Sequence, residues 1–286
     1  MTFNAKFSLK ALSLAALLLP SLASAIELPL FKKEAEERGY TLPEAFGLSL
    51  GYMNVSQGIN VDSIKLSGFD SFLGPIINNL DIATKGGYQE SEVLTLKADV
   101  WVLPFLNFYA IGGKLNGFSE TTITDVKLGS TTLLSELAVP FRLDLDGYTY
   151  GAGTVIAGGY ESVFALVDAS YTKTSLTVIN GEIDSIVVSP RIGYDFSRNT
   201  DWPIRAWIGA QYQNIEQTLT GNVRDLPITL PSWIGDNGTF TVNQSLANNW
   251  NSLVGAQYEF TPNWVLISEL GFGQRKSFFV TLDARF

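Results

Sequence analysis

The side chains that most often carry out catalysis are scarce in this chain. Among its 286 residues there is no histidine and no cysteine. Histidine has the ordinary pKa nearest to neutral pH, so its absence removes the usual general base. Without cysteine, disulfides and thiolate metal sites are excluded. A serine–lysine or paired-carboxylate site would need another base. Because no motif supplies one, we expect no enzymatic activity.

Two short acidic stretches carry oxygen atoms that could bind a cation. They are DLDG at residues 144–147 and GDNG at residues 235–238. A complete calcium loop needs more oxygen ligands at fixed spacing, and the same residue types are common in turns. We therefore expect turns at both places, with no metal site and no cofactor.

A set of charged residues forms the most informative chemical pattern, with five basic and six acidic members. In a narrow interior of low dielectric constant, such charges have to pair in a closed network. In an open pore, the same charges would select ions or small polar solutes. The set consists of Lys97, Asp99, Lys114, Asp168, Arg191, Asp195, Arg205, Glu259, Glu269, Asp283 and Arg285.

The elements that must position these charges are β-strands. Runs with a two-residue period, rich in Val, Ile, Thr, Tyr and Trp, are separated by clusters of Gly, Pro, Asn and Asp. Strong helix patterns are nearly absent, apart from the short charged stretch FKKEAEER at residues 31–38. The sequence predicts ten strands, at residues 46–58, 91–103, 107–120, 145–159, 162–177, 184–197, 203–221, 248–260, 264–273 and 276–286.

Each predicted strand has one uncharged face, and the charged set lies on the opposite face together with many glycines. In the first strand, for example, Leu48 and Leu50 belong to the uncharged face. In the third strand we place Lys114 on the charged face. The uncharged face of that strand then carries Tyr109, Ile111, Gly113 and Leu115.

Alternation alone leaves open which face is inside. A soluble barrel of the lipocalin type would bury the apolar face, whereas a membrane barrel turns it to lipid. The glycine-rich charged face suits a crowded lumen, and the chain ends on the aromatic Phe286. Aromatic residues also gather near the short connections, as at a membrane interface. They are Trp101, Phe105, Phe108, Phe196, Trp202, Phe260, Trp264 and Phe286.

These features predict an all-β fold, a transmembrane antiparallel up-and-down β-barrel of about ten strands. Lipid offers no hydrogen-bond partners to the backbone, so a sheet that crosses it must close on itself. Eight or twelve strands are alternatives, because residues 59–68 and 121–128 are either extra strands or extensions above the membrane. A barrel of this size has little free space, which favours a largely filled lumen.

The connections between the predicted strands alternate in length. PFL, YE, SRNTD and TPN are short, whereas residues 59–90, 121–144 and 222–247 are long. In outer-membrane barrels, the short turns lie in the periplasm and the long loops outside, so both termini would be periplasmic. The long connections contain apolar stretches that either cover the barrel mouth or meet a partner or lipid A. These stretches are residues 72–80, 133–141 and 226–235.

One residue fits the pattern poorly. Pro190 lies in the middle of the sixth predicted strand, where its missing N–H should break a hydrogen bond of the sheet. We expect either a bulge at this position or an error in the boundaries of that strand.

The N-terminal residues have the pattern of a secretory signal peptide. Lys6 and Lys10 precede an apolar run at residues 11–19, and Ala23-Ser24-Ala25 forms a cleavage site before Ile26. Cleavage lowers the formal charge from −9 to −11, which argues against nucleic-acid binding. The expected domains are a signal peptide at 1–25, a periplasmic N-terminal segment at 26–45, and the barrel at 46–286. The segment before the barrel is either a solvated tail or a plug.

Several stretches together resemble a family of uncharacterised outer-membrane β-barrel proteins of Gram-negative bacteria. They are LPEAFGLSLGYMNVSQGINVDSI, WVLPFLNFYAIGG, DGYTYGAGTVIAGGY, VVSPRIGY, WIGAQYQNIEQTL and ELGFGQRKSF. The resemblance spans nearly all of the mature chain. It implies location and fold, and it brings no activity or catalytic residues. The C-terminal Phe286 resembles the signal read by the outer-membrane assembly machinery, although Ala284 stands where a bulkier apolar residue is usual.

Two functions remain open at this point. Small outer-membrane barrels that are enzymes, such as omptin-like proteases, the outer-membrane phospholipase, and the lipid A palmitoyl transferase and deacylase, use a histidine that this chain lacks. We therefore expect a non-enzymatic barrel that is membrane-structural or binds through its long loops. A small-solute or ion channel is the alternative. The expected partners are outer-membrane lipid and lipopolysaccharide, the assembly machinery, and a possible extracellular ligand.

Overall fold

The computed structural model describes residues 28–69, 72, 74–225 and 238–286, and the expected signal peptide lies outside these residues. The described residues form one antiparallel sheet of thirteen strands. The strands are β1 (Phe46–Ser67), β2 (Leu80–Leu103), β3 (Leu106–Leu128), β4 (Thr131–Leu134), β5 (Val139–Asp144), β6 (Gly147–Tyr160), β7 (Val163–Leu176), β8 (Asn180–Asp195), β9 (Ile204–Asn222), β10 (Thr239–Leu246), β11 (Trp250–Thr261), β12 (Trp264–Phe272) and β13 (Arg275–Arg285). Short helices are α2 (Lys32–Glu37), α3 (Gly74–Ile77), and the single-turn helices η1 (Phe196–Arg198) and η2 (Val223–Asp225).

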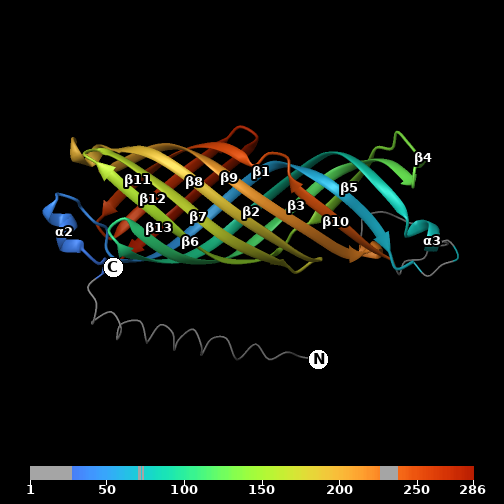
Figure 1. Ribbon diagram of the computed structural model, residues 1–286, viewed down its shortest axis with the longest axis horizontal. Helices are drawn as coiled ribbons and strands as arrows, with labels where there is room; N and C mark the ends of the chain where they lie inside the picture. The colour runs from blue at the N-terminus through green and yellow to red at the C-terminus, as the bar shows by residue number, and fades with distance from the viewer. Residues whose placement is uncertain (1–27, 70–71, 73, 226–237) are drawn as a thin grey trace, which may run out of the picture.

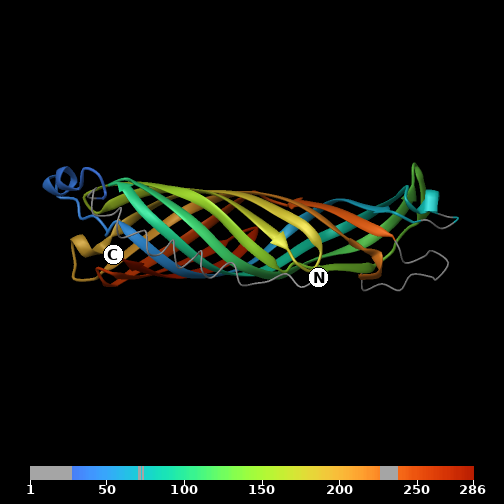
Figure 2. The ribbon, with the colours of Figure 1, turned by 90° about the horizontal axis from the view of Figure 1, so that it is seen from below.

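Ten of these strands pair in a closed ring, in the order β1, β2, β3, β6, β7, β8, β9, β11, β12, β13. The ring closes because β1 pairs with both β2 and β13. At the seam, the N–H of Phe46 donates to the carbonyl of Phe286 at 3.1 Å, and the N–H of Phe286 donates back at 3.0 Å. Figures 1 and 2 show the resulting elongated barrel from two directions, with the strands inclined to its long axis.

The two ends of the barrel differ. At the end that we call terminal, Figure 1 shows the C-terminus and α2, which lies beyond the ends of the strands. At the opposite, distal end lie α3 and β4. The N–H of Leu30 donates to the carbonyl of Val102 at 2.9 Å, which attaches the segment before the barrel to the terminal end of β2.

The long connections expected from the sequence are largely strand. Residues 59–67 and 121–128 are extensions of β1 and β3, and residues 80–90 extend β2 in the same direction. The expectation that residues 222–247 form a loop is wrong for residues 239–246, because these form β10. This strand pairs with the extended parts of β1 and β9 and satisfies their backbone groups. We call this set of extended strands, with β4, β5 and β10, the distal extension.

The outer surface of the ring is apolar, as the alternation of the strands predicts. Outward-facing side chains such as Leu50, Leu96 and Ile208 are 56%, 54% and 64% exposed. Alternate residues along the strands face the lumen, where Ser49 on β1 and Asp283 on β13 are buried. Most of the expected aromatic girdle is exposed at the terminal end, including Phe105, Phe260 and Phe286. Trp101 differs, because it shares the inward parity of Asp99 on β2.

The predicted faces of the third strand are reversed. Lys114 is exposed, and its partners on the neighbouring strands are the outward-facing Leu94 and Tyr148. Tyr109 and Leu115, assigned to the uncharged outer face, point inward instead. Both faces of this strand are rich in apolar residues, so the single charge at Lys114 decided the assignment. A lysine can lie on a lipid-facing surface when its long stem carries the ammonium to a polar boundary.

The distal extension contains the apolar core of the molecule. Side chains from several strands and from α3 pack together inside it, and Leu219 and Val242 are fully inaccessible. Phe141 and Phe240 meet edge to face with ring centroids 6.1 Å apart. The buried members are Ile64, Phe69, Ile77, Val93, Leu115, Phe141, Leu143, Leu145, Leu219, Val223, Phe240 and Val242.

Pro190 lies inside β8 without a register shift, so neither a bulge nor a wrong strand boundary explains it. Pairing with β7 is continuous and includes Val167 opposite Pro190. Pairing with β9 stops at Val188–Tyr212 and resumes at Arg191–Gly209. The side of Pro190 that lacks an N–H therefore faces β9, and the sheet has a gap in its hydrogen bonding there.

Candidate functional site

The centre of the charged set is an ion pair that crosses the lumen. Arg191 on β8 donates from Nε and Nη2 to Glu269 on β12, at 2.7 and 3.1 Å. Trp207 on β9 donates its indole N–H to the same carboxylate at 2.9 Å. Gly255 on β11 makes room for this indole, because an added Cβ would lie 2.5 Å from the ring. The carboxylate thus has three donors, which is the saturation that a buried charge requires.

A second cluster lies beside the first. The hydroxyl of Tyr109 on β3 donates to Asp168 on β7 at 2.7 Å. The ammonium of Lys97 on β2 lies 5.5 Å from the centroid of the Tyr109 ring, within the range of a cation–π interaction. Three strands are linked in this way through one aromatic side chain.

Two further pairs lie near the terminal end. Asp99 accepts hydrogen bonds from Arg285 at 3.1 Å and from Asn107 at 2.7 Å. Asp195 accepts from Nε of Arg205 at 2.8 Å and from the backbone N–H of Ser197 at 3.1 Å, which caps η1. These contacts hold the last strand and the turn between β8 and β9 to their neighbours.

The structure therefore joins eight of the eleven predicted residues into contacts of this kind, and three stand apart. Asp283 accepts a hydrogen bond only from Thr281, at 3.1 Å, within the described residues. Glu259 faces inward, but its side chain has no hydrogen bond or ion pair to any described residue. Lys114 lies outside the barrel and does not belong to the network.

The predicted set missed one buried charge. Arg275 at the start of β13 is 3% exposed. It donates to the side-chain oxygens of Gln57 and Gln211 at 2.8 and 2.9 Å, and no described carboxylate lies within salt-bridge distance of it. Arg275 has the same parity as Asp283 and Arg285, so extending the last predicted strand backward by one residue would have found it.

Amides dominate the lumen between Arg275 and the apolar core. Gln217 donates to Gln89 at 3.0 Å, and Gln244 donates to Ser119 at 3.3 Å. The side-chain oxygens of Gln217 and Gln244 are buried and lack a protein partner. The lumen thus changes along its length from ion pairs to amides and then to packed apolar side chains.

Of the two stretches suspected of binding a cation, only DLDG lies within the described residues. Asp144 ends β5, Leu145 belongs to the apolar core, and Gly147 begins β6, so DLDG is a turn between two strands. GDNG lies outside the described residues apart from Gly238. Within the part of the chain that the structure covers, no group of acidic residues is arranged to hold a metal ion. The described helices also include none that is long and apolar enough to cross a membrane.

The apolar loop stretches are divided between core and surface. Ile77 and Phe141 are buried in the apolar core. Phe72, Leu133 and Leu134 are exposed at the distal end. The third stretch, at residues 226–235, lies outside the described residues. Within the described residues, these stretches cover the barrel mouth only in part, and most of the buried core residues belong to strands.

No protein-family model matches this chain, and no curated protein matches it. Solved barrels of low similarity do match over most of their length. The transport unit of the autotransporter AIDA-I from Escherichia coli is 12% identical, covers 93% of this chain and 95% of its own, and has a TM-score of 0.39. The outer membrane protein OprG from Pseudomonas aeruginosa is 11% identical, with 86% and 98% covered and a TM-score of 0.38.

The translocator domain of the autotransporter NalP from Neisseria meningitidis is 10% identical, covers 99% of this chain and 100% of its own, and also has a TM-score of 0.38. Because all three TM-scores are below 0.5, the functions of these proteins tell nothing about the function of this chain.

Proposed function

We propose that the chain is a non-enzymatic transmembrane β-barrel of the bacterial outer membrane whose lumen is closed. Its role is membrane-structural, or it binds a ligand through the distal extension. The observation that carries the proposal is the combination of an apolar outer belt with an apolar core across the distal lumen.

The belt supports the membrane location. Large apolar side chains on all ten strands of the ring are turned outward, and a continuous apolar surface of this extent is unfavourable in water. In a bilayer, the same surface is solvated by hydrocarbon, and the closed ring leaves no backbone edge without a partner. The opposite arrangement, with charges outside, would be expected of a soluble barrel.

The short turns lie at the terminal end, as do the start of β1 and the end of β13. We therefore place this end in the periplasm and the distal extension outside the cell. This orientation agrees with export through a signal peptide at residues 1–25 and cleavage near Ala25–Ile26. Contacts with lipid and lipopolysaccharide around the belt and recognition of Phe286 by the assembly machinery belong to the same proposal.

The distal core supports the proposal that the lumen is closed. Leu219, Phe240 and Val242 project inward from β9 and β10 and are at most 1% exposed. A solute that moved along the barrel axis would have to separate these side chains, each of which loses about 1.5–3 kcal/mol of burial free energy when exposed. The ion pairs nearer the terminal end then stabilise the barrel rather than select ions.

One observation favours a channel instead. Arg275 is a buried cation that faces the lumen without a carboxylate partner among the described residues. A positive charge of this kind could attract anionic solutes if the distal core opened. The channel therefore remains the second candidate.

Planar-bilayer recording of the refolded protein separates the two functions. A closed barrel should give no stepwise conductance, whereas replacing Leu219, Phe240 and Val242 together by alanine should produce steps. Leu50→Ala, which shortens an outward-facing side chain, serves as the control and should stay silent. Steps in the wild type whose anion selectivity falls in Arg275→Gln would establish the channel and reject the closed barrel.

A further inference from the structure

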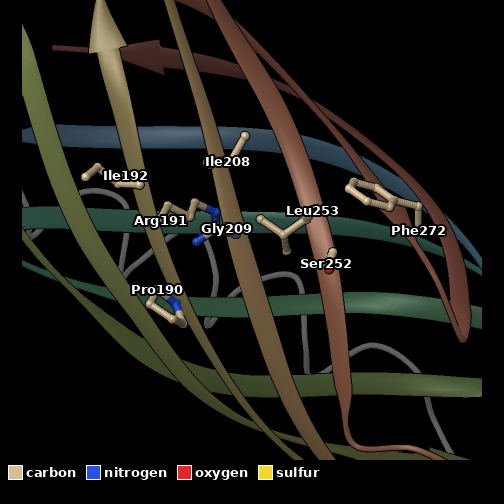
Figure 3. A pocket seen from close by; sticks show the side chains of 8 residues that line it. All are labelled: Pro190, Arg191, Ile192, Ile208, Gly209, Ser252, Leu253 and Phe272. Atoms are coloured by element: carbon tan, nitrogen blue, oxygen red, sulfur yellow. The ribbon is translucent and has the colours of Figure 1, made fainter.

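The gap between β8 and β9 at Pro190 coincides with a groove on the outside of the barrel. Figure 3 shows the residues around it, which come from β8, β9, β11 and β12. The groove has a volume of about 460 Å³, within the usual range of pockets that bind small molecules. It is lined by Pro190, Arg191, Ile192, Ile208, Gly209, Ser252, Leu253 and Phe272.

The walls of the groove are apolar and belong to the outer belt. Pro190, Ile192, Ile208 and Phe272 have the outward parity of their strands and are exposed. Ser252 adds a small side chain on the same face. A hydrocarbon chain lying in the groove would contact a proline ring, two isoleucines and a phenylalanine. The one charged lining residue, Arg191, directs its guanidinium inward to Glu269.

The floor of the groove includes Gly209, which has no side chain on the inner face of the sheet. A Cβ added to Gly209 would lie 2.6 Å from the carbonyl oxygen of Pro190, 2.7 Å from Cδ1 of Leu253 and 3.0 Å from Cγ of Arg191. The inward-facing side chains of Leu253 and Arg191 therefore pack directly beneath the backbone at this point. Since Pro190 cannot donate across the gap, the two strands are held together here less tightly than elsewhere.

We propose that this groove binds one acyl chain of a membrane lipid. The inference rests on the proposed membrane location, which makes hydrocarbon the medium around the belt. The chain is already in hydrocarbon, so its preference for the groove comes from van der Waals packing. In the groove it contacts protein atoms on several sides, and each pair of atoms in contact contributes about 0.1–0.2 kcal/mol. The bound lipid thus remains associated with this barrel when other lipids exchange.

The test uses substitutions that fill the groove, each with a matched control outside it. Ser252→Trp and Ile192→Trp place an indole in the groove, whereas Ser268→Trp and Ile186→Trp place the same side chain on the outer face of β12 and β8, away from it. The proteins are refolded in dioleoylphosphatidylcholine vesicles, transferred to detergent, and weighed by native mass spectrometry. The readout is the fraction of barrels that retain one lipid.

The wild type and both controls should retain one lipid. In both groove variants the affinity for the lipid should fall about tenfold, equivalent to about 1.4 kcal/mol, and the fraction of barrels that retain one lipid should fall with it. Equal loss in Ser268→Trp or Ile186→Trp, or no retention in the wild type, overturns the proposal. A dimer mass in the wild type that disappears in Ser252→Trp also overturns it, because a second copy would then occupy the groove. The two independent groove positions guard against the misfolding of one variant.

The outcome is distinguishable from a failure of the proposed function. If the wild type remains in the aqueous fraction when vesicles are floated on a density gradient, the membrane location itself is wrong. If it floats with the vesicles but retains no lipid after transfer, only the lipid-binding groove is rejected.

Discussion

Arg191 and Glu269 satisfy each other inside the barrel through two hydrogen bonds. Removing one partner of a buried pair leaves the other charge uncompensated, which costs about 3–5 kcal/mol. We expect Glu269→Ala to lower the free energy of unfolding by this amount, measured by urea titration in vesicles. The double variant Arg191→Met with Glu269→Leu should recover most of the loss.

An exposed pair provides the comparison. Lys173 and Glu182 approach to 2.6 Å, but their side chains are 28% and 59% exposed. Such pairs contribute at most about 1 kcal/mol, so Lys173→Ala should be nearly neutral. If Glu269→Ala is equally neutral, the lumen is well hydrated and the network does not stabilise the barrel.

The outward position of Lys114 leads to a second residue-level prediction. Since the chain has no cysteine, Lys114→Cys and Lys97→Cys can each be labelled with a fluorophore. A lipid-soluble quencher should reduce the emission at position 114 strongly and at position 97 weakly, because only the first side chain lies on the outer face. Equal quenching at the two sites would contradict the faces assigned to β2 and β3.

Single residues also show where the sequence was sufficient. Nine strands have the predicted faces because charge and apolarity were separated cleanly on them, as at Leu50 and Asp283. The faces predicted for the third strand were wrong because they were assigned from one lysine, Lys114. Tyr109 instead points inward, where its hydroxyl donates to Asp168 on β7. That contact depends on the closure of the barrel, so no local pattern reveals it.

The element that the sequence did not predict is β10. Its alternating residues, with Phe240, Val242 and Leu246 inward, do show a strand pattern. However, it lies in the distal extension and pairs there with β1 and β9. These two strands are not neighbours of each other in the ring. Spacing of strands and turns predicts an up-and-down order, and an additional strand that joins only at one end lies outside that order.

Loss of packing in β10 should affect the distal extension alone. Phe240→Ala removes a buried aromatic side chain from the core, a change that usually costs about 3–5 kcal/mol. We expect faster hydrogen exchange in residues 59–67, 216–222 and 239–246 and unchanged exchange near Phe46 and Phe286. Phe72→Ala, at an exposed position of the distal end, is the control and should leave both regions unchanged.

Strand β8 permits a direct test of the gap at Pro190. Pro190→Ala supplies an N–H that can donate to β9, and one net hydrogen bond stabilises a protein by about 0.5–1.5 kcal/mol. We expect a higher urea midpoint, protection of the new amide at position 190, and slower exchange of the amide at Val188, which faces β9 as well. Val188→Ala, in the same strand, should show no such protection, and unchanged exchange in Pro190→Ala would mean that the gap has another cause.

At the scale of the whole molecule, the apolar outer surface of the ring favours a hydrocarbon environment. A charged side chain on the lipid-facing surface of a barrel costs about 2–4 kcal/mol near the middle of the membrane. Leu50→Lys should therefore be strongly destabilising in vesicles. Asn60→Lys, exposed on the distal extension, should change the unfolding free energy by less than about 0.5 kcal/mol. Similar effects at both positions would argue against a hydrocarbon environment around Leu50.

The reciprocal hydrogen bonds between Phe46 and Phe286 also constrain how the protein is made. The first strand, β1, can pair with β2 early, but its other edge has a neighbour only after β13 has been synthesised. Until then, two strand edges are open to any other chain. Closure of the ring is therefore the last pairing to form, because it joins the first and last strands of the series.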